Sequence, residues 1–225
     1  MRKMSLYSDV SLDRKDESDF LKVFHAVSFA IAECRQQVGL RMVRVLPRDV
    51  HLIHDSWTAT ATEHGHPQKV DGFYEWKNKQ CYVLNQMAVP WSEGECPVQR
   101  ILKTRTASVL THEMVHRGSS GGLRVFSRLL NEGMTDSFAA EIYRQRISRI
   151  LTTGYSPSYP NEQLMWSHMK CSEPEAIRDI VASYWRGNSE AGREAVVNGF
   201  GRKLGTALSN METSVQEIMN ALKHA

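Results

Sequence analysis

The chain has 225 residues, and 41% of them are apolar, which is enough for the core of one compact domain or of one domain divided by a cleft. Its 28 basic and 25 acidic residues leave a net charge of +3, too small for the electrostatic field that non-specific nucleic-acid binding needs. The cysteines, Cys34, Cys81, Cys96 and Cys171, have no paired spacing, so we expect free thiols in a reducing compartment and neither a disulfide framework nor a thiol metal site.

The N-terminal part of the chain predicts a helix and no targeting segment. The first residues turn polar without an apolar core segment, and no run of about 18 apolar residues follows. We therefore expect a cytoplasmic protein with no Sec signal and no membrane partner; an effector would need a secretion route without such a signal. From 16 to 38, apolar residues recur at helical intervals, which predicts an amphipathic helix.

The next part of the chain predicts a small, mostly antiparallel sheet. β-branched and aromatic residues are enriched in segments that we expect to be strands: 50–54, 57–62, 72–76 and 81–85. A turn at 77–80 predicts that 72–86 forms a hairpin. Structural or surface roles are expected for the histidines of this region: His51, His54, His64 and His66. The exposed edge of such a sheet can bind an extended peptide as an added strand, so we expect a polypeptide substrate.

The region from Pro97 to the glycine-rich segment 118–122 predicts a helix that carries a metal-binding motif. Its apolar residues recur at near-helical spacing, and the glycines provide a turn. Because residues four apart lie on one face of a helix, the imidazoles of His112 and His116 can reach one cation, with Glu113 beside them to handle a water proton. A random chain of this composition would contain this motif about 0.025 times, so the match by itself is suggestive.

A second helix is predicted after the turn, and it can bring a third ligand, Glu132, to the metal, with Asp136 one turn later. Two neutral histidines and one carboxylate hold a zinc ion with its fourth position open for water, which is the arrangement of catalytic zinc. We therefore expect one Zn²⁺ as cofactor.

This pattern resembles the gluzincin branch of the zincin metallopeptidases, in which His-Glu-x-x-His is followed by a Glu on a second helix and an Asp one turn later. The resemblance implies that His112, His116 and Glu132 are the zinc ligands and Glu113 the general base. It also implies that Asp136 accepts a hydrogen bond from a ligand imidazole, a role that its spacing suits.

The segment 132–140 is similar to the corresponding helix of ImmA/IrrE-type metallopeptidases and to zincin domains of bacterial polymorphic toxins and secreted effectors. Together these resemblances cover about residues 97–142. A second hydrogen-bond donor for the oxyanion is expected among Tyr155, Tyr159 and His168, and Tyr159 is preferred because it begins a Tyr-Pro element similar to one in some toxin-type zincins. Packing is the alternative role for a tyrosine in such a turn.

Beyond Gly154 the chain predicts helices near 160–170, 173–186, 189–208 and 211–223. Arg144, Arg146 and Arg149 precede them and are expected to form a solvated face, so no nucleic-acid partner is expected. The predicted fold class is α+β and zincin-like, with one catalytic domain over 1–225 that has an α+β subdomain at 1–122 and a helical subdomain at 123–225.

The predicted function is that of a zinc metallopeptidase, a hydrolase that cleaves peptide bonds of a protein substrate with metal-activated water and a Glu general base. Two alternatives stay open. One is a binding protein that keeps a zincin scaffold and recognises a protein partner without turnover. The other is hydrolysis of a non-peptide amide. The residues alone assign neither the substrate nor the oligomeric state.

Overall fold

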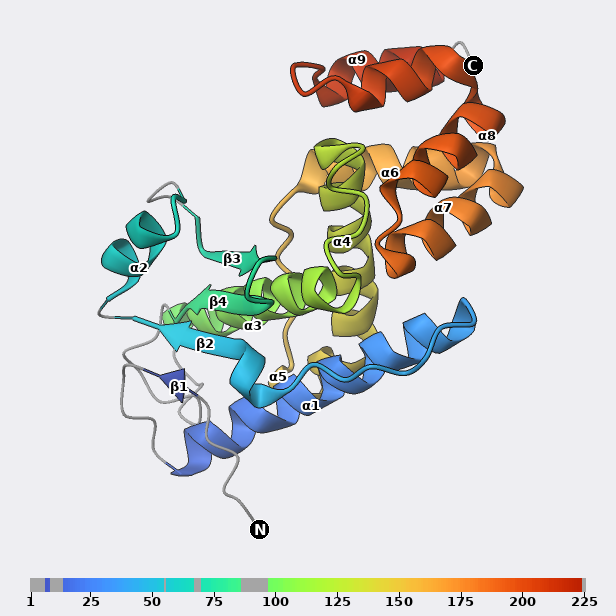
Figure 1. Cartoon of the computed structure of the whole chain (residues 1–225). Helices are drawn as coiled ribbons and strands as arrows, with labels where there is room; N and C mark the ends of the chain where they lie inside the picture. The colour runs from blue at the N-terminus through green and yellow to red at the C-terminus, as the bar shows by residue number, and fades with distance from the viewer. Residues whose placement is uncertain (1–6, 9–13, 55, 67–69, 86–96, 224–225) are drawn as a thin grey trace. The chain divides into compact units, whose positions relative to one another are not determined.

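The computed structural model describes residues 7–8, 14–54, 56–66, 70–85 and 97–223 (Figure 1). The chain is an α+β protein, as predicted. Its elements follow in chain order: β1 (Tyr7–Ser8), α1 (Arg14–Gln37), η1 (Pro47–Asp49), β2 (Val50–Ile53), α2 (Trp57–Glu63), β3 (Gly72–Glu75), β4 (Gln80–Leu84), α3 (Pro97–Gly118), α4 (Arg128–Ile142), η2 (Tyr143–Ile147), α5 (Ser148–Leu151), α6 (Pro160–Ser172), α7 (Pro174–Arg186), α8 (Ser189–Ser209) and α9 (Val215–Leu222). No described helix is both long and apolar enough to cross a membrane.

The chain divides into two compact units, each made of separate segments. Unit 1 contains 1–33, 42–118 and 139–156, and unit 2 contains 34–41, 119–138 and 157–225. Each unit therefore draws on chain from both sides of residue 122, where the sequence places a subdomain boundary.

The sheet of unit 1 has the strand order β1-β2-β4-β3. Strands β3 and β4 form the predicted hairpin, with Tyr74 opposite Cys81. The β1–β2 and β2–β4 pairs are both parallel, so the prediction of a mostly antiparallel sheet is wrong. Two strands that pair in parallel, such as β2 and β4, need a connection that crosses over the sheet, and a helix usually supplies it. Here the helix lies in the segment between β2 and β3.

That helix is α2, in the segment predicted as a strand at 57–62, and this prediction is also wrong. The alternation of Thr and Ala imitates a strand, but the buried residues are Trp57 and Ala61, four apart, as on one face of a helix. Both pack with Ile53 and Phe73 in a small apolar cluster. Burial of the large Trp57 ring thus outweighs the strand preference of the threonines around it.

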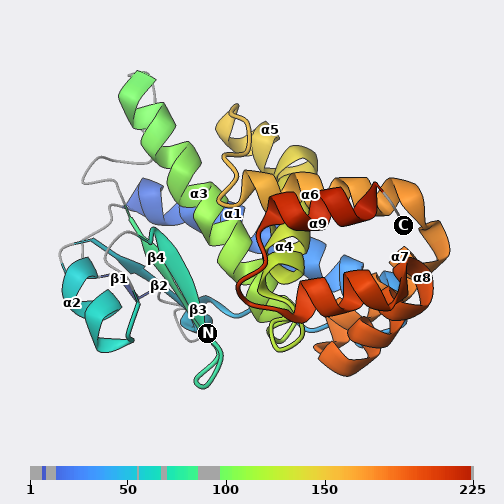
Figure 2. The same cartoon turned by 90° about the horizontal axis from the view of Figure 1, so that it is seen from above.

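Helix α3 lies alongside β3 and β4, as Figures 1 and 2 both show. The approach is closest at Gly72, where an added Cβ would lie 2.4 Å from Val109 Cγ1 and 3.2 Å from Glu113 Cγ. Only a residue without a side chain allows the start of β3 to come this near to the helix. The sheet thereby fixes the half of α3 that carries the metal motif.

Arg144, Arg146 and Arg149 are exposed, as predicted for a solvated face. Arg144 pairs with Glu141 at 2.8 Å, and Arg146 pairs with Glu33 at 2.9 Å. Two of these three arginine charges are therefore compensated by ion pairs within unit 1.

Unit 2 contains the C-terminal helices, which match their predicted ranges closely except that α9 begins four residues later than expected, at Val215. Helices α7 and α8 pack side by side, visible in Figure 2. Their approach is close at Gly199, where an added Cβ would lie 2.2 Å from the Cβ of Ala176.

Candidate metal centre

The metal motif lies in the last two turns of α3, and its three polar side chains are buried. His112, Glu113 and His116 are 2%, 6% and 8% exposed. Such groups are rarely removed from water without a partner, because an unpaired buried polar group is costly. The helix ends at Gly118, as predicted, and the chain then turns through Gly121 and Gly122, which both have positive φ.

The two imidazoles of the motif face each other within unit 1. Their Nε2 atoms are 3.1 Å apart and their ring centroids are 4.7 Å apart. Two nitrogens bound to one tetrahedral zinc ion at about 2.0–2.1 Å would be about 3.3 Å apart. The separation of the two Nε2 atoms therefore fits two ligands of one cation.

Glu132 completes a group that could hold a metal ion. His112, His116 and Glu132 each offer one ligand atom, and these atoms all lie within 4.8 Å of one another. These are the three residues that the sequence predicts as ligands. Their donor set, two imidazole nitrogens and one carboxylate oxygen, suits a zinc ion and leaves a fourth position for water.

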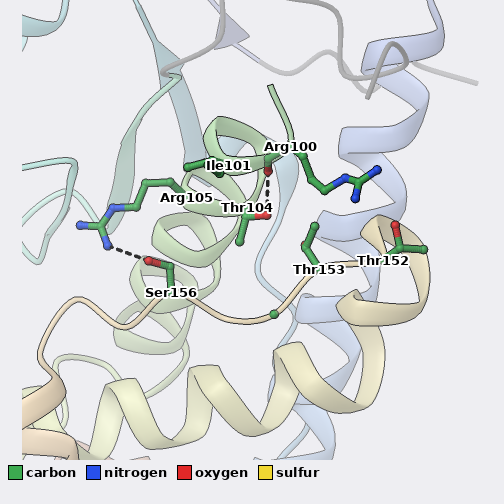
Figure 3. Close-up of a pocket in the computed structure, with 8 residues that line it drawn as sticks. Arg100, Ile101, Thr104, Arg105, Thr152, Thr153 and Ser156 are labelled. Atoms are coloured by element: carbon green, nitrogen blue, oxygen red, sulfur yellow. Dashed lines mark hydrogen bonds between the residues drawn. The ribbon is translucent and has the colours of Figure 1, made fainter. Parts of the chain in front are cut away.

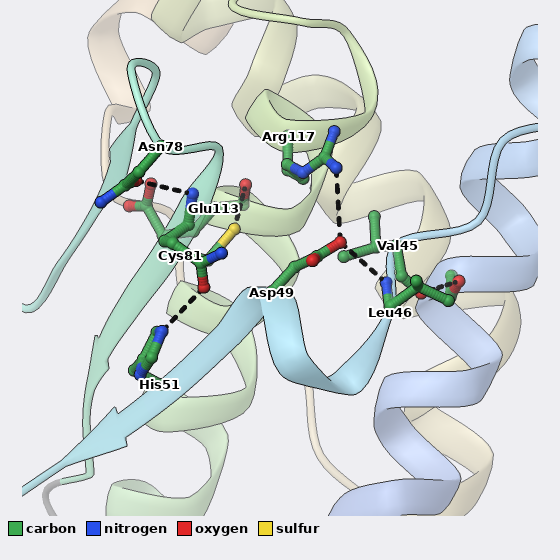
Figure 4. A network of polar contacts seen from close by, with 10 residues as sticks. Val45, Leu46, Asp49, His51, Asn78, Cys81, Glu113 and Arg117 are labelled. Carbon is green, nitrogen blue, oxygen red and sulfur yellow. Dashed lines mark hydrogen bonds and ion pairs between the residues drawn. The ribbon is translucent and has the colours of Figure 1, made fainter. Parts of the chain in front are cut away.

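Glu113 is fixed through its backbone as well as by packing against Gly72. Its carbonyl oxygen accepts a hydrogen bond from Cys81 Sγ at 3.3 Å, as Figure 4 shows. Cys81 lies on β4 and is fully buried, and this burial raises the pKa of its thiol well above the usual value. The cysteine therefore stays a neutral thiol that ties the sheet to the helix turn of Glu113.

A second polar contact fastens the last turn of α3, next to His116. The Arg117 guanidinium pairs with Asp49 at 3.3 Å, and the same Asp49 oxygen accepts a hydrogen bond from the backbone of Leu46 at 3.1 Å (Figure 4). Asp49 ends η1, directly before β2. The ion pair therefore joins α3 to the chain that enters the sheet.

In unit 2, the first turns of α4 are held by polar contacts on both sides of the half-buried Glu132. Asn131 Oδ1 accepts a hydrogen bond from the backbone of Leu123 at 2.9 Å, and the hydroxyls of Thr135 and Tyr184 are 2.7 Å apart. Burial raises the pKa of Tyr184 far above its usual value, and the nearby charge of Glu132 adds to the effect. Tyr184 is therefore neutral at physiological pH and remains a hydrogen-bond partner of Thr135.

Asp136 and Tyr159 are brought together by the structure. The carboxylate of Asp136 is fully buried and accepts hydrogen bonds from the backbone N–H groups of Ser158 and Tyr159. Asp136 thus fixes the chain just before α6, and Tyr159 occupies the position that precedes the first turn of that helix. The predicted roles of Asp136 toward an imidazole and of the Tyr159 hydroxyl toward an oxyanion stay predictions.

The upstream histidines pack against aromatic rings, which confirms the structural role predicted for three of them. His51 stacks on Tyr82 with ring centroids 4.8 Å apart, and His66 stacks on Phe73 at 4.0 Å. His64 contacts both of these aromatic rings. Within the described part of the chain, the group of His112, His116 and Glu132 is the one metal-ligand set of three or more residues found.

Sequence reasoning missed the residues that support the site, namely Gly72, Asp49 and Tyr184, and it did not connect Cys81 with Glu113. A glycine at the start of a predicted strand is a signal of close backbone approach, and this signal was present at Gly72. No local pattern indicates the partners of the other residues, because each of them contacts a distant segment.

Comparison of the chain with models of protein families, with curated proteins and with solved structures finds no match. The resemblance to the gluzincins therefore stays a prediction from the motif residues, and the structure adds only that His112, His116 and Glu132 could hold a metal ion.

Proposed function

We propose that this protein is a zinc-dependent metallopeptidase. The observation that carries the proposal is the grouping of ligand atoms from His112, His116 and Glu132, with Glu113 next to the first ligand in the chain. A structural zinc site is closed by four protein ligands, whereas a site with three leaves a position for chemistry. The buried carboxylate of Glu113 gives this site a candidate proton acceptor.

The roles of the residues follow from their chemistry. When bound, a zinc ion supplies a Lewis acid that polarises a carbonyl group and lowers the pKa of water to about 7. His112, His116 and Glu132 would hold it. Glu113 takes the proton of the attacking water and then gives it to the leaving amine of the substrate. Tyr159 remains our candidate for the second hydrogen-bond donor to the oxyanion.

A polypeptide substrate is supported by the edge of the sheet. Among the described strands, β3 pairs with β4 alone, and it begins at Gly72, beside Glu113. The other edge of β3 can form main-chain hydrogen bonds with an extended peptide, which is a general mode of peptide recognition. Such a peptide would run past the proton acceptor.

The decisive experiment compares the wild-type protein with Glu113→Gln. We expect purified wild-type protein to bind zinc with 1:1 stoichiometry and to cleave members of a random peptide library, detected by mass spectrometry. Glu113→Gln should retain zinc and lose about 10²–10⁴-fold in cleavage rate, because the proton acceptor is gone. The matched control is Glu141→Gln, an exposed glutamate of α4, which should cleave as wild type does.

Two results would contradict this proposal in different ways. Cleavage that persists at the wild-type rate in Glu113→Gln would exclude Glu113 as the proton acceptor. A wild-type protein that binds zinc but cleaves nothing would reject the peptidase and favour the alternative of a zincin-like binding protein.

A further inference from the structure

Unit 1 contains a cavity of about 420 Å³ between the N-terminal half of α3 and the segment from Thr152 to Ser156 (Figure 3). The side chains of Arg100, Thr104 and Arg105 line it from α3. Two contacts hold the segment against the helix: the backbone N–H of Ser156 donates to Ser108 Oγ at 3.0 Å, and Arg105 contacts Ser156 Oγ at 3.5 Å. The segment that forms this side of the cavity is therefore held in place by hydrogen bonds to α3.

The lining favours an anion. It contains two arginines and four hydroxyl side chains, and none of the residues that line it is acidic. Arg105 is held by Asp71 at 2.7 Å, so part of its charge is compensated. Arg100 is exposed, and among the described residues no carboxylate pairs with its guanidinium. In Figure 3 Arg100 points toward the Thr152 and Thr153 end of the segment.

Part of the cavity lining, Ile101 and Arg105, lies on the same face of α3 as His112. Ile101, Arg105, Ser108 and His112 follow one another at spacings of four, three and four residues, which is one face of a helix. The rise of a helix places Arg105 about 11 Å before His112 along the axis. Arg100, twelve residues before His112, lies about 18 Å before it. An extended peptide covers these two distances in about three and about five residues.

The edge strand leads to the same place. Asp71, which holds Arg105, directly precedes β3, so a peptide added along β3 and followed beyond Gly72 reaches Arg105 and the cavity that it lines. We propose that this cavity binds an acidic side chain of the polypeptide substrate, about three to five residues from the cleaved bond, with Arg100 as the main specificity residue. This inference deepens the proposed function and rests on it.

A binding measurement tests the pocket without requiring cleavage. The probes are two fluorescein-labelled hexapeptides, Ala-Ala-Glu-Glu-Ala-Ala and its Gln-Gln counterpart, and fluorescence anisotropy is measured on the Glu113→Gln protein. We expect the Glu peptide to bind about tenfold more tightly, as one charge-assisted hydrogen bond allows. Adding Arg100→Glu should abolish the preference. Adding Arg202→Glu, the same charge change on an exposed arginine of α8, should preserve it.

A cleavage measurement tests the position of the acidic residue. Digestion of the random peptide library by the wild-type protein should give products enriched in Glu or Asp about three to five residues from the cut. Arg100→Glu should lose this enrichment while cleavage itself continues. A library that is not cut at all rejects the proposed function, whereas the anisotropy still reports on the pocket.

Three outcomes overturn the inference: equal binding of the two peptides, a preference for Glu that survives Arg100→Glu, or a preference that Arg202→Glu also removes. A further arm titrates inorganic phosphate into the wild-type protein. Phosphate binding that Arg100→Glu removes, without any preference for the Glu peptide, would show a site for a small free anion and would likewise reject the peptide subsite.

Discussion

Helices α3 and α4 each carry candidate ligands, but different contacts hold them in their units. In unit 1, α3 packs against β3 and β4 at the close approach of Val109 to Gly72. In unit 2, the part of α4 around Glu132 is held by hydrogen bonds that Asn131 Oδ1 and the Asp136 carboxylate accept from backbone N–H groups. The hydroxyl of Thr135 also hydrogen-bonds with that of Tyr184.

The difference matters because the two kinds of contact fail differently. Apolar packing is not directional, so swaps that conserve volume cost little. A buried hydrogen bond leaves an unsatisfied group when one partner is removed, which costs about 1–3 kcal/mol. We therefore expect the contact of Gly72 with Val109 to be sensitive to side-chain volume. Asn131, Thr135 and Asp136 should instead be sensitive to the loss of a hydrogen-bonding group.

The largest effect is expected from the ligand that α4 supplies. Loss of a group that only hydrogen-bonds to a metal ligand reduces metal affinity by up to about 100-fold. Glu132→Ala should reduce zinc affinity by more than this, because it removes a bond to the metal itself. Isothermal titration with Zn²⁺ measures the change. Glu141→Ala removes an exposed carboxylate from the same helix and should bind zinc as wild type does. Equal affinities for the two variants would exclude Glu132 as a ligand.

The effect of added side-chain volume on stability can be tested at one glycine of each unit. An added Cβ at Gly133 would lie 2.3 Å from the backbone oxygen of Glu162, whereas at Gly72 the nearest atom is a methyl of Val109. Both Gly→Ala variants should lose about 1–3 kcal/mol in the free energy of unfolding, and Gly133→Ala should lose more because backbone cannot rotate away. Chemical denaturation measures both.

Gly154→Ala is the matched control for these two variants, because nothing lies within 4 Å of its added Cβ, and it should change stability by less than about 0.5 kcal/mol. A larger loss at Gly72 than at Gly133 would contradict the expectation that the Val109 side chain yields more easily than the Glu162 backbone.

Asp136→Asn separates two roles of one carboxylate. The variant weakens the acceptor for the N–H groups of Ser158 and Tyr159, so we expect a loss of about 1–2 kcal/mol in the free energy of unfolding. If Asp136 also orients a ligand imidazole, zinc affinity falls by about 10–100-fold. Unchanged zinc affinity at reduced stability would leave Asp136 with the loop-fixing role alone.

The smallest effect concerns Tyr184 at alkaline pH. Burial raises the pKa of the folded-state hydroxyl above the value near 10 that it has when unfolded. The contribution of the neutral Tyr184 hydroxyl to the free energy of unfolding is therefore complete below pH 10. It declines as the pH rises toward the folded-state pKa, by at most about 1.4 kcal/mol per pH unit. Tyr184→Phe should show a shallower loss of unfolding free energy between pH 9 and 11. Identical pH slopes for the two proteins would contradict this account.

The helices were predictable where periodicity and end signals agree. The first helix, the helix that ends at Gly118 and the C-terminal helices have apolar residues at helical spacing between Gly, Pro or capping residues, so local chemistry is sufficient. The segment 57–62 misled the prediction because its alternation is between Thr and Ala, which carry little burial energy, while the large Trp57 side chain decided the structure.

What the sequence determined by itself is which residues have the chemistry and spacing of metal ligands, because four positions along a helix are set by backbone geometry alone. Tertiary structure decided the parallel pairing of β2 with β4, the contact of Gly72 with Val109 and the cavity that Arg100 and Ser156 line. These features join residues far apart in the chain. Their free energy comes from burial and from hydrogen bonds that form only once distant segments have met, and no local pattern records that choice.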